Sequence, residues 1–313
     1  MIGTKKSNNC IGTSAFRLGS LSLWAVLTAT LAATGEIAAA ETAPVDTRTP
    51  LWVLTEGVDT PESAYIDAGS GFIYVSMIVG SPMEKDGNGR IAKLTLDGKV
   101  VSMSWVSGLN APKGLRSYNG TLWTADIDGV VSIEIATGRV TARIKVPNAR
   151  MLNDLACGLD GTVYVSDTIA STIYAIKDGQ VTIFAQGEDL EYPNGVLVEQ
   201  YRLIVGGWGK PPTDPTATGL GRLFALDLKT AKRTAITPKP IANIDGVESD
   251  GRGGWYLSDN PTGKILHVSP TGEVLTVAEV GPGAADISYS PTRRILVVPY
   301  LSGNKVSAFD LGR

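Results

Sequence analysis

Histidine and cysteine are nearly absent from this sequence, whose 313 residues include one His and two Cys. Cys10 lies near the amino terminus, in a segment that we expect to be removed. Cys157 is then the only thiol left, so no disulfide can form within one chain and the fold must be stable through packing. The single His, together with the absence of a G-x-S-x-G motif, argues against a Ser-His-Asp triad.

Excess charge and long helical patterns are also missing. Lys and Arg (28 residues) nearly balance Asp and Glu (31 residues), which leaves a formal net charge of −3. No electrostatic feature therefore favours a nucleic-acid partner. After residue 41 no long apolar segment has a period of 3.6 residues, which argues against a helical domain.

The one long uncharged run lies at residues 18–35, where three basic residues precede it and the sequence AAA at 38–40 follows it. This order is typical of a secretory signal peptide with its cleavage site, and an uncleaved membrane anchor is the alternative. We expect residues 1–40 to be a signal peptide, residues 41–50 a linker, and the protein to be exported, periplasmic or secreted, without membrane contact after cleavage. Cleavage removes three positive charges and one negative, which changes the net charge from −3 to −5.

A short apolar strand pattern recurs through the rest of the chain. Its copies begin 49, 41, 40, 52 and 40 residues apart. They are GFIYVSM (71–77), GTLWTAD (120–126), GTVYVSD (161–167), YRLIVGG (201–207), GGWYLSD (253–259) and RRILVVP (293–299). A period in the forties, made of short strands and Gly- or Asp-containing turns, predicts a β-propeller with four strands per blade.

The sixth repeat ends at the carboxyl terminus directly after its third strand, KVSAFDL. The missing fourth strand is expected at residues 51–57, LWVLTEG, which precede the first repeat. Pairing this segment with the last blade would close the ring and remove two exposed sheet edges. We therefore predict an all-β protein, a six-bladed β-propeller over residues 51–313 that is closed by its amino-terminal strand.

Six polar residues stand where the innermost strand of each repeat begins. They are Glu62, Lys113, Asn153, Asn194, Asp245 and Asp286. Since innermost strands line the channel of a propeller, these side chains are expected to converge at one end of it. A turn or a strand cap explains a single Asn or Asp equally well, but six equivalent polar positions favour a common site.

Apart from Lys113, these residues offer oxygen donors, and none offers sulfur or imidazole nitrogen. Oxygen donors suit hard cations, above all Ca²⁺, with Mg²⁺, Mn²⁺ or Zn²⁺ as alternatives. Two carboxylates, Glu62 and Asp245, would neutralise one divalent ion, and the amide oxygens of Asn153 and Asn194 would complete part of its shell. Calcium takes 6–8 oxygen ligands, which leaves room for water or a substrate.

The order of these residues resembles the SMP-30/gluconolactonase/luciferin-regenerating-enzyme-like group, whose fold is shared by diisopropylfluorophosphatase and the paraoxonases. The resemblance rests on PES at Glu62, LND at Asn153, PNG at Asn194 and IDG at Asp245, and it covers residues 50–313. It implies one divalent metal ion held by Glu62, Asn194 and Asp245, with Asn153 as ligand or substrate contact. It also implies hydrolysis of lactones or related esters.

Two positions depart from that group. Sugar-lactone hydrolases often carry Arg two residues before the blade 3 Asn, where this chain has Met151, and no His pair of the paraoxonase kind is available. Lys113 is expected to bind an acidic group of the substrate or to balance Asp286. Further substrate contacts are expected at Met151 and Asp286 and, from the loops at the same face, at Met77, Trp208 and Tyr300.

We therefore predict an exported, monomeric, metal-dependent hydrolase that acts on a small-molecule lactone or ester. Asp245 is the candidate catalytic residue, as general base or nucleophile. The alternative is a non-catalytic propeller that binds a ligand or protein and contains a structural metal. Cys157 and His267 are expected to be packing or surface residues rather than catalytic groups.

Overall fold

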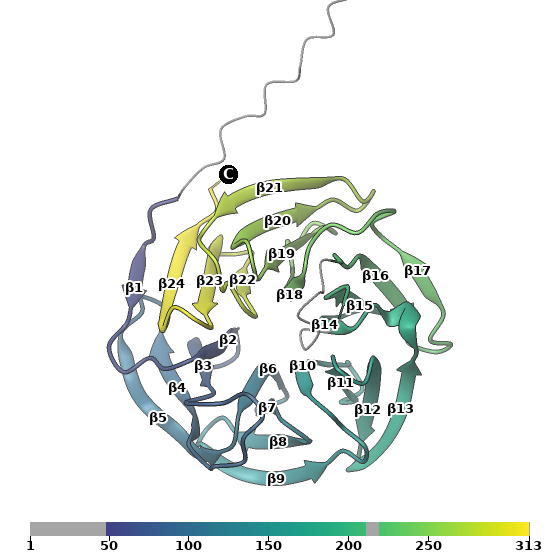
Figure 1. Ribbon diagram of the computed structural model, residues 1–313. Helices are drawn as coiled ribbons and strands as arrows, with labels where there is room; N and C mark the ends of the chain where they lie inside the picture. Colours follow the sequence, from purple (N-terminus) through teal and green to yellow (C-terminus); the bar gives the residue numbers. More distant parts are fainter. Residues whose placement is uncertain (1–47, 211–218, 313) are drawn as a thin grey trace, which may run out of the picture. The chain divides into compact units, whose positions relative to one another are not determined.

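The computed structural model describes residues 48–210 and 219–312, which form six four-stranded antiparallel sheets arranged around a central axis (Figure 1). The inner strands follow one another around this axis, and each contacts the next. From the axis outward, blade 1 contains β2 (Pro61–Asp67), β3 (Phe72–Met77), β4 (Gly89–Thr95) and β5 (Val100–Leu109). Blade 2 contains β6 (Pro112–Tyr118), β7 (Thr121–Asp126), β8 (Gly129–Glu134) and β9 (Arg139–Lys145). Blade 3 contains β10 (Leu152–Cys157), β11 (Val163–Asp167), β12 (Thr172–Lys177) and β13 (Gln180–Gln186).

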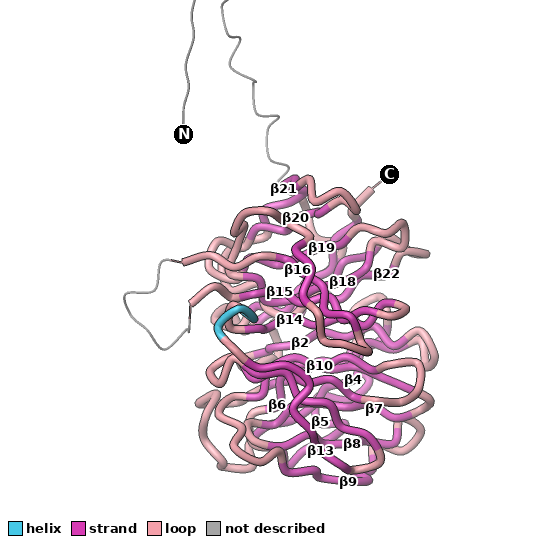
Figure 2. Tube along the Cα trace, turned by 90° about the vertical axis from the view of Figure 1, so that its right-hand side faces the viewer, coloured by secondary structure: helices cyan, strands magenta, loops and turns pink. Residues whose placement is uncertain are grey.

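The remaining blades repeat this order. Blade 4 contains β14 (Pro193–Glu199), β15 (Arg202–Gly207), β16 (Leu223–Asp227) and β17 (Arg233–Ala235). Blade 5 contains β18 (Ile244–Ser249), β19 (Trp255–Asp259), β20 (Lys264–Val268) and β21 (Val274–Glu279). Blade 6 contains β22 (Ser288–Ser290), β23 (Ile295–Tyr300), β24 (Lys305–Asp310) and, outermost, β1 (Trp52–Leu54). Within the described ranges the only helix is a single turn, η1 (Glu188–Leu190), which joins β13 to β14 (Figure 2).

The amino-terminal strand closes the ring as predicted. β1 pairs antiparallel with β24, and Trp52, Val53 and Leu54 lie opposite Ala308, Ser307 and Val306. The last blade is thus built from both ends of the propeller, so separating its strands would open the ring. The predicted six-bladed fold is confirmed, whereas the predicted signal peptide lies outside the described residues. Within the described part of the chain, no helix is long and apolar enough to cross a membrane.

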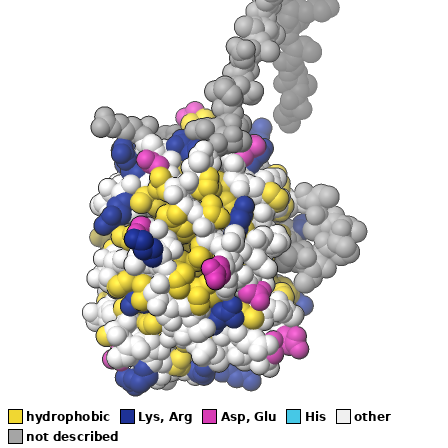
Figure 3. Space-filling view, turned by 90° about the vertical axis from the view of Figure 1, so that its left-hand side faces the viewer, with side chains coloured by type: hydrophobic (Ala, Val, Ile, Leu, Met, Phe, Trp, Pro, Cys, Tyr) yellow, Lys and Arg dark blue, Asp and Glu magenta, His cyan; other side chains and the backbone are white. Residues whose placement is uncertain are grey.

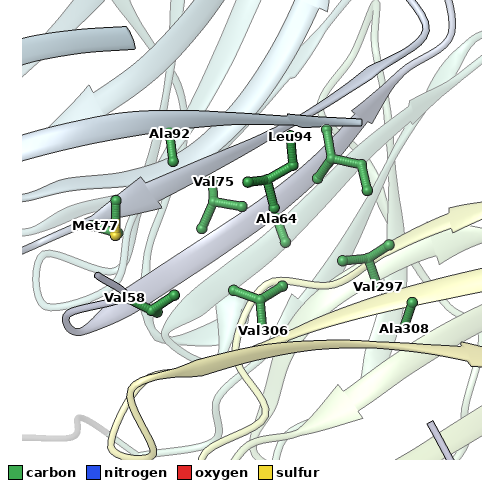
Figure 4. Close-up of a cluster of buried hydrophobic side chains, with 10 residues drawn as sticks. Val58, Ala64, Val75, Met77, Ala92, Leu94, Val297, Val306 and Ala308 are labelled. Atoms are coloured by element: carbon green, nitrogen blue, oxygen red, sulfur yellow. The ribbon is translucent and has the colours of Figure 1, made fainter. Parts of the chain in front are cut away.

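Apolar side chains fill the spaces between neighbouring blades. The cluster between blades 6 and 1 shows this arrangement: Val75 and Leu94 from blade 1 face Val297 and Val306 from blade 6 (Figure 4). Burying a side chain of this size stabilises the folded state by about 1.5–3 kcal/mol. Because the ends of the ring meet here, this cluster stabilises its closure along with the β1–β24 pair.

The outer surface of blades 6 and 1 exposes several apolar side chains. Leu51, Val53 and Val101 are each at least half exposed, and Val100 is 43% exposed. They lie on or beside β1 and β5, on the side of the ring where Figure 3 shows apolar side chains gathered among charged ones. These outer positions lie at the rim, far from the inner strands.

Candidate functional site

Each inner strand from β2 to β18 contains an irregularity in its register near its first residues. In blade 5, Ile244 lies opposite Asp259 but Val247 lies opposite Leu257, so three steps along β18 match two along β19. The same extra residue occurs in blades 1 to 4. Such a β-bulge re-aims side chains locally, and five of the six predicted site residues stand at these bulges, each directly after the first pair of its strand. The equivalent place in blade 6 belongs to Ala285, because Ala284 lies opposite Tyr300 and Ser258 donates to the Ala285 carbonyl as Ser166 does to that of Asn194. Asp286 therefore stands one residue further along the chain than the position predicted for it, beside Ser63 of blade 1.

Side chains of the second strands fix these bulges. In three blades the serine near the end of the second strand accepts a hydrogen bond from the backbone N–H of the residue that follows the site residue, at 2.8–3.0 Å. The pairs are Ser76 with Ser63, Ser166 with Asp154 and Ser258 with Gly246. Two of these hydroxyls also donate to the next blade: Ser166 to the carbonyl of Asn194 and Ser258 to that of Ala285. The serine in the repeated second-strand sequence therefore links the site residues of neighbouring blades.

Glycine follows the site residue in three blades, where the inner strands nearly touch. A Cβ on Gly246 would lie 2.5 Å from the backbone nitrogen of Ile287, and one on Gly195 would lie 2.9 Å from Val247 Cγ2. Both positions exclude any larger side chain without movement of a blade. The N-G and D-G sequences thus bring the site residues of adjacent blades close together.

The six predicted side chains are all buried, with exposed fractions between 2% and 7%. Five of their oxygen atoms are buried and have no hydrogen-bond partner. These atoms are Glu62 Oε2, Asn153 Oδ1, Asn194 Oδ1, Asp245 Oδ1 and Asp286 Oδ1. A buried polar atom without a partner costs about 1–3 kcal/mol, so five of them on neighbouring strands indicate that a positively charged or hydrogen-bonding group binds among them.

The carboxylates at this point repel one another. Burial, together with the charges of Asp245 and Asp286, raises the pKa of Glu62 well above its usual value. Burial and the charge of Asp286 raise the pKa of Asp245 to about 7, although hydrogen bonds from Asn260 and Asn194 oppose the shift. These mutual effects show that carboxylates from blades 1, 5 and 6 lie close together.

Several site residues use one polar atom of the side chain in a hydrogen bond, which leaves one oxygen without a partner. Asn260 Nδ2 donates to Asp245 Oδ2 at 2.7 Å, which leaves Oδ1 without a partner. Asn153 Nδ2 donates to Thr168 Oγ1 at 3.3 Å, and Ser63 Oγ donates to Asp286 Oδ2 at 2.6 Å. In each case the neighbouring group orients the side chain and one oxygen stays available.

These residues fit a hard divalent cation by their chemistry. Glu62 and Asp245 supply negative charge, and Asn153 and Asn194 supply amide oxygens of the kind that calcium accepts. Among the described residues no three His, Cys, Asp or Glu side chains are grouped closely enough to hold a metal ion alone. A metal here would therefore depend on the two amides as well as the carboxylates.

Lys113 stands at the bulge of β6 as predicted, but its ammonium binds two carbonyl groups. Its Nζ donates to the carbonyls of Pro82 and Ala111, both at 3.1 Å. Burial lowers its pKa, and the charges of Glu62 and Asp126 oppose that shift. The expectation that Lys113 balances Asp286 is not met, since its acidic neighbours are these two residues.

A second layer of charge lies deeper in the channel, and the sequence reading missed it. Arg116 Nη1 contacts Glu248 Oε1 at 2.7 Å, and both side chains are about 90% buried. Burial lowers the pKa of Arg116, but Glu248, Asp154 and Asp286 outweigh that effect and raise it above its usual value. Arg116 thus supplies the positive charge that was expected from Lys113.

Asp154 belongs to this layer and also joins two blades. Its Oδ2 accepts the N–H of Val196 in blade 4, and its Oδ1 accepts that of Leu155, both at 2.7 Å. Burial raises its pKa to about 7, although Arg116 and these N–H groups oppose the shift. Asp154, adjacent to a predicted ligand, therefore holds blades 3 and 4 together.

Of the residues predicted to line the pocket, some are too buried to contact a ligand. Met77 and Tyr300 are completely buried in the apolar clusters between blades, which leaves neither side chain available to contact a substrate. Met77 lies opposite Pro61 in blade 1, and Asp126 lies opposite Pro112 at the same position in blade 2. The Asp126 carboxylate accepts hydrogen bonds from backbone N–H groups there. This position faces the next blade rather than the channel.

Met151 and Trp208 are half-buried; Met151 directly precedes β10, and Trp208 directly follows β15. The backbone of Trp208 is fixed by its N–H bond to Tyr192 and by Asn243 Nδ2, which donates to its carbonyl at 2.5 Å. Both residues remain candidates for contact with a ligand.

His267 and Cys157 are absent from the site, as expected. His267 Nε2 lies 2.8 Å from Asp250 Oδ2, near the opposite ends of the inner strands. Cys157 is half-buried at the end of β10, and burial raises the pKa of its thiol to about 12. A thiol with such a pKa is a poor nucleophile.

Comparisons with known proteins identify the architecture. No family model matches the sequence, and no curated protein matches it. A chain of a nidogen/laminin complex matches with a TM-score of 0.59 and 14% identity, over 72% of this chain and 87% of that chain. Virginiamycin B lyase from Staphylococcus aureus, in a catalytically inactive form with quinupristin, matches with a TM-score of 0.56 and 14% identity, over 83% and 97%. The selenomethionine form of the same lyase matches with a TM-score of 0.56 and 12% identity, over 82% of this chain and 98% of that chain. These structures, one an enzyme and one part of a binding complex, share the six-bladed propeller fold with this chain.

Proposed function

We propose that this protein is a divalent-metal-dependent hydrolase of lactones or related esters, of the SMP-30/gluconolactonase kind, with Ca²⁺ as the metal. One observation carries the proposal: the four residues assigned as ligands each contain a buried oxygen without a partner. The order of these residues along the blades resembles that group, and the shared fold is compatible with an enzyme.

Glu62, Asn153, Asn194 and Asp245 would hold the ion. A bound divalent cation supplies a Lewis acid that polarises a carbonyl and stabilises the oxyanion that develops on it. It would also neutralise the repulsion among the buried carboxylates, because a nearby positive charge lowers carboxyl pKa values. Lys113, whose charge lowers the pKa of Glu62, would help to keep that ligand ionised.

Asp245 is the residue that we assign to proton transfer or attack. The bond from Asn260 fixes its Oδ2 and leaves Oδ1 as the reactive or metal-facing oxygen. As a general base it would take a proton from water as the water attacks the ester carbonyl. The products are a carboxylic acid and an alcohol, which are joined in one molecule when the substrate is a lactone.

A second candidate function is non-catalytic binding with a structural metal. The site residues are no more than 7% exposed, which leaves little of their surface for a substrate. Under this proposal the metal would fix the inner strands and a face of the ring would bind the partner. The two proposals share the metal and differ in turnover.

The test is metal binding followed by turnover of a lactone panel. Dialysed protein should bind about one Ca²⁺ with a raised melting temperature, because a ligand that binds the native state stabilises it. Turnover that disappears with chelator and returns with calcium supports the hydrolase. Calcium binding without turnover supports the structural metal, and no binding of any divalent ion refutes both.

Substitutions separate ligand from catalyst. Asp245→Asn keeps an oxygen donor but loses basicity, so kcat should fall by about 10²–10⁴-fold at saturating calcium. Asn194→Ala should instead weaken calcium binding, with activity partly restored by added calcium. Asp189→Asn is the matched control, because Asp189 is exposed on η1 and loses the same charge. If saturating calcium restores Asp245→Asn fully, Asp245 is only a ligand.

A further inference from the structure

A cavity lies between blades 5 and 6, at the opposite ends of the inner strands from the candidate metal site. It has a volume of about 590 Å³, which is within the range of about 300–1,000 Å³ typical of small-molecule sites. Its walls come from the turn between β18 and β19, the turn between β22 and β23, and the segments beside β1 and β24. We call it the seam cavity, because it lies at the boundary between blades 5 and 6.

The charged side chains that line the seam cavity are mostly positive. Arg252 and Arg294 line it, and Asp250 is the one acidic residue among the lining side chains that the structure describes. Arg48 also lines the cavity, but its Nη1 already donates to the carbonyl of Asp310. Asp250 is already engaged: Oδ1 accepts the N–H groups of Arg252 and Gly254 at 2.6 and 2.9 Å, and Oδ2 contacts His267. The local excess of positive charge contrasts with the formal net charge of −3 for the whole chain.

Two tyrosines form an aromatic wall of the same cavity. The rings of Tyr256 and Tyr289 meet edge to face with centroids 4.6 Å apart, and His267 lies 5.1 Å from Tyr256. All three rings are half-buried, so each contacts neighbouring side chains and still presents part of its surface. Such rings make favourable edge or face contacts with a further aromatic ring.

We propose that the seam cavity binds a small aromatic anion, a ring that carries a phosphate or carboxylate. Guanidinium groups match the geometry of such oxyanions and bind them with two parallel hydrogen bonds. The tyrosine wall packs against the ring of the ligand. Arg252 belongs to the turn between β18 and β19 in blade 5 and Arg294 to the turn between β22 and β23 in blade 6, so the bound anion joins these two blades.

Titration calorimetry with phenyl phosphate tests the proposal, with chelator present so that the metal site is not involved. We expect one binding site and a raised melting temperature. Inorganic phosphate should bind at least about tenfold more weakly, and phenol should show no measurable binding, because each lacks half of the recognised chemistry. Phenyl phosphate should bind the Asp245→Asn variant as well as the wild type. The absence of binding at the seam cavity can therefore be distinguished from the absence of hydrolase activity at the metal site.

Adjacent arginines provide a matched pair of variants. Arg294→Gln should weaken phenyl phosphate binding at least about tenfold, since a charge-assisted hydrogen bond contributes about 1.5–3 kcal/mol. Arg293→Gln removes the same charge from an exposed neighbour that lines a different groove, and should change binding less than about twofold. Arg252→Gln gives a second variant should Arg294→Gln fail to fold.

Three results would overturn the assignment. The first is no heat and no melting shift at millimolar phenyl phosphate. The second is equal weakening by the Arg293 and Arg294 variants, which would indicate general electrostatic attraction. The third is equal affinity for phosphate and phenyl phosphate, which would remove the aromatic part of the ligand.

Discussion

Replacing Gly195 with Ala tests how closely the inner strands approach at the candidate site. The new Cβ would lie 2.9 Å from Val247 Cγ2 and closer still to the backbone oxygen of Asp245, whereas ordinary contact begins near 3.4 Å. The neighbouring atom that is closest belongs to the backbone, so no side-chain rotation relieves the clash. Blades 4 and 5 would have to move apart at this point.

The magnitude follows from this geometry. Overpacking of a rigid contact costs about 1–3 kcal/mol, and a backbone neighbour places Gly195→Ala in the upper half of that range. The melting temperature should therefore fall by about 4–10 °C in a protein of this size. Because the movement displaces Asn194 and Asp245 together, calcium affinity should also fall at least about tenfold, which is about 1.4 kcal/mol.

Chemical denaturation and calcium titration measure the two effects. Gly69→Ala is the control: the nearest atom to its added Cβ is Asp67 Oδ2, at an ordinary distance of 3.6 Å. It should change the free energy of unfolding by less than about 1 kcal/mol. If Gly195→Ala matched this control in both stability and calcium affinity, the close approach of blades 4 and 5 would not be what positions the site.

Other substitutions examine the surroundings of the site. Arg116→Met leaves the deeper carboxylates without their cation and should lower the free energy of unfolding by about 3–5 kcal/mol, measured by denaturation. The double variant with Glu248→Gln should recover part of that loss, and no recovery would argue against the pairing. Ser258→Ala leaves the bulge N–H and a carbonyl of the next blade without a partner and should cost about 1–3 kcal/mol; a loss near zero would mean that water replaces the hydroxyl. Despite the opposing effect of burial, the bond to His267 and two N–H groups lower the pKa of Asp250. Its contribution to stability is therefore present above its unfolded pKa and lost as the pH falls through the folded one. The melting difference between wild type and Asp250→Asn should shrink below about pH 4, and a difference that is independent of pH would indicate packing instead of charge.

The sequence predicts the architecture because the propeller repeats its strand pattern six times. The second strand of each blade is recognisable on its own, and the missing fourth strand of the last repeat leaves one segment, at 51–57, to complete it. The mouth residues could be found for the same reason, since each stands seven to nine residues before a recognisable strand. This variation in spacing explains why the predicted Asp286 stands one residue away from the equivalent position. The fold thus follows from spacing, which requires no knowledge of individual contacts.

Pocket walls could not be found in this way. We expect Met77 and Tyr300 at the pocket as residues of the loops after the second strands, but both are the last residues of those strands. The side chains at that position point between blades, where blades 2, 3 and 5 have Asp and bind backbone N–H groups. Distance along a strand gives the face of the ring but not the direction of each side chain.

The deeper charged layer has a signal in the sequence that becomes readable once the bulges are known. In a regular strand, residues two apart share a face, so the partner of Lys113 would be sought at Leu115. The bulge adds one residue, so the side chain that faces the channel next is Arg116, three positions on. The same step leads from Asp245 to Glu248 and from Glu62 to Tyr65, whose ring lies 5.1 Å from the Arg116 guanidinium.

These two layers explain why the mouth of the channel favours a cation. Arg116 pairs with Glu248 and offsets part of the charge of Asp154 and Asp286, so the deeper layer already contains its own positive group. The mouth has only Lys113, whose ammonium is bound to two carbonyls of blade 2 and its neighbouring loop. Its carboxylates therefore either take up protons, as the raised pKa values of Glu62 and Asp245 indicate, or bind an external cation. Metal affinity should accordingly increase with pH, because the ion and the protons compete for the same oxygens.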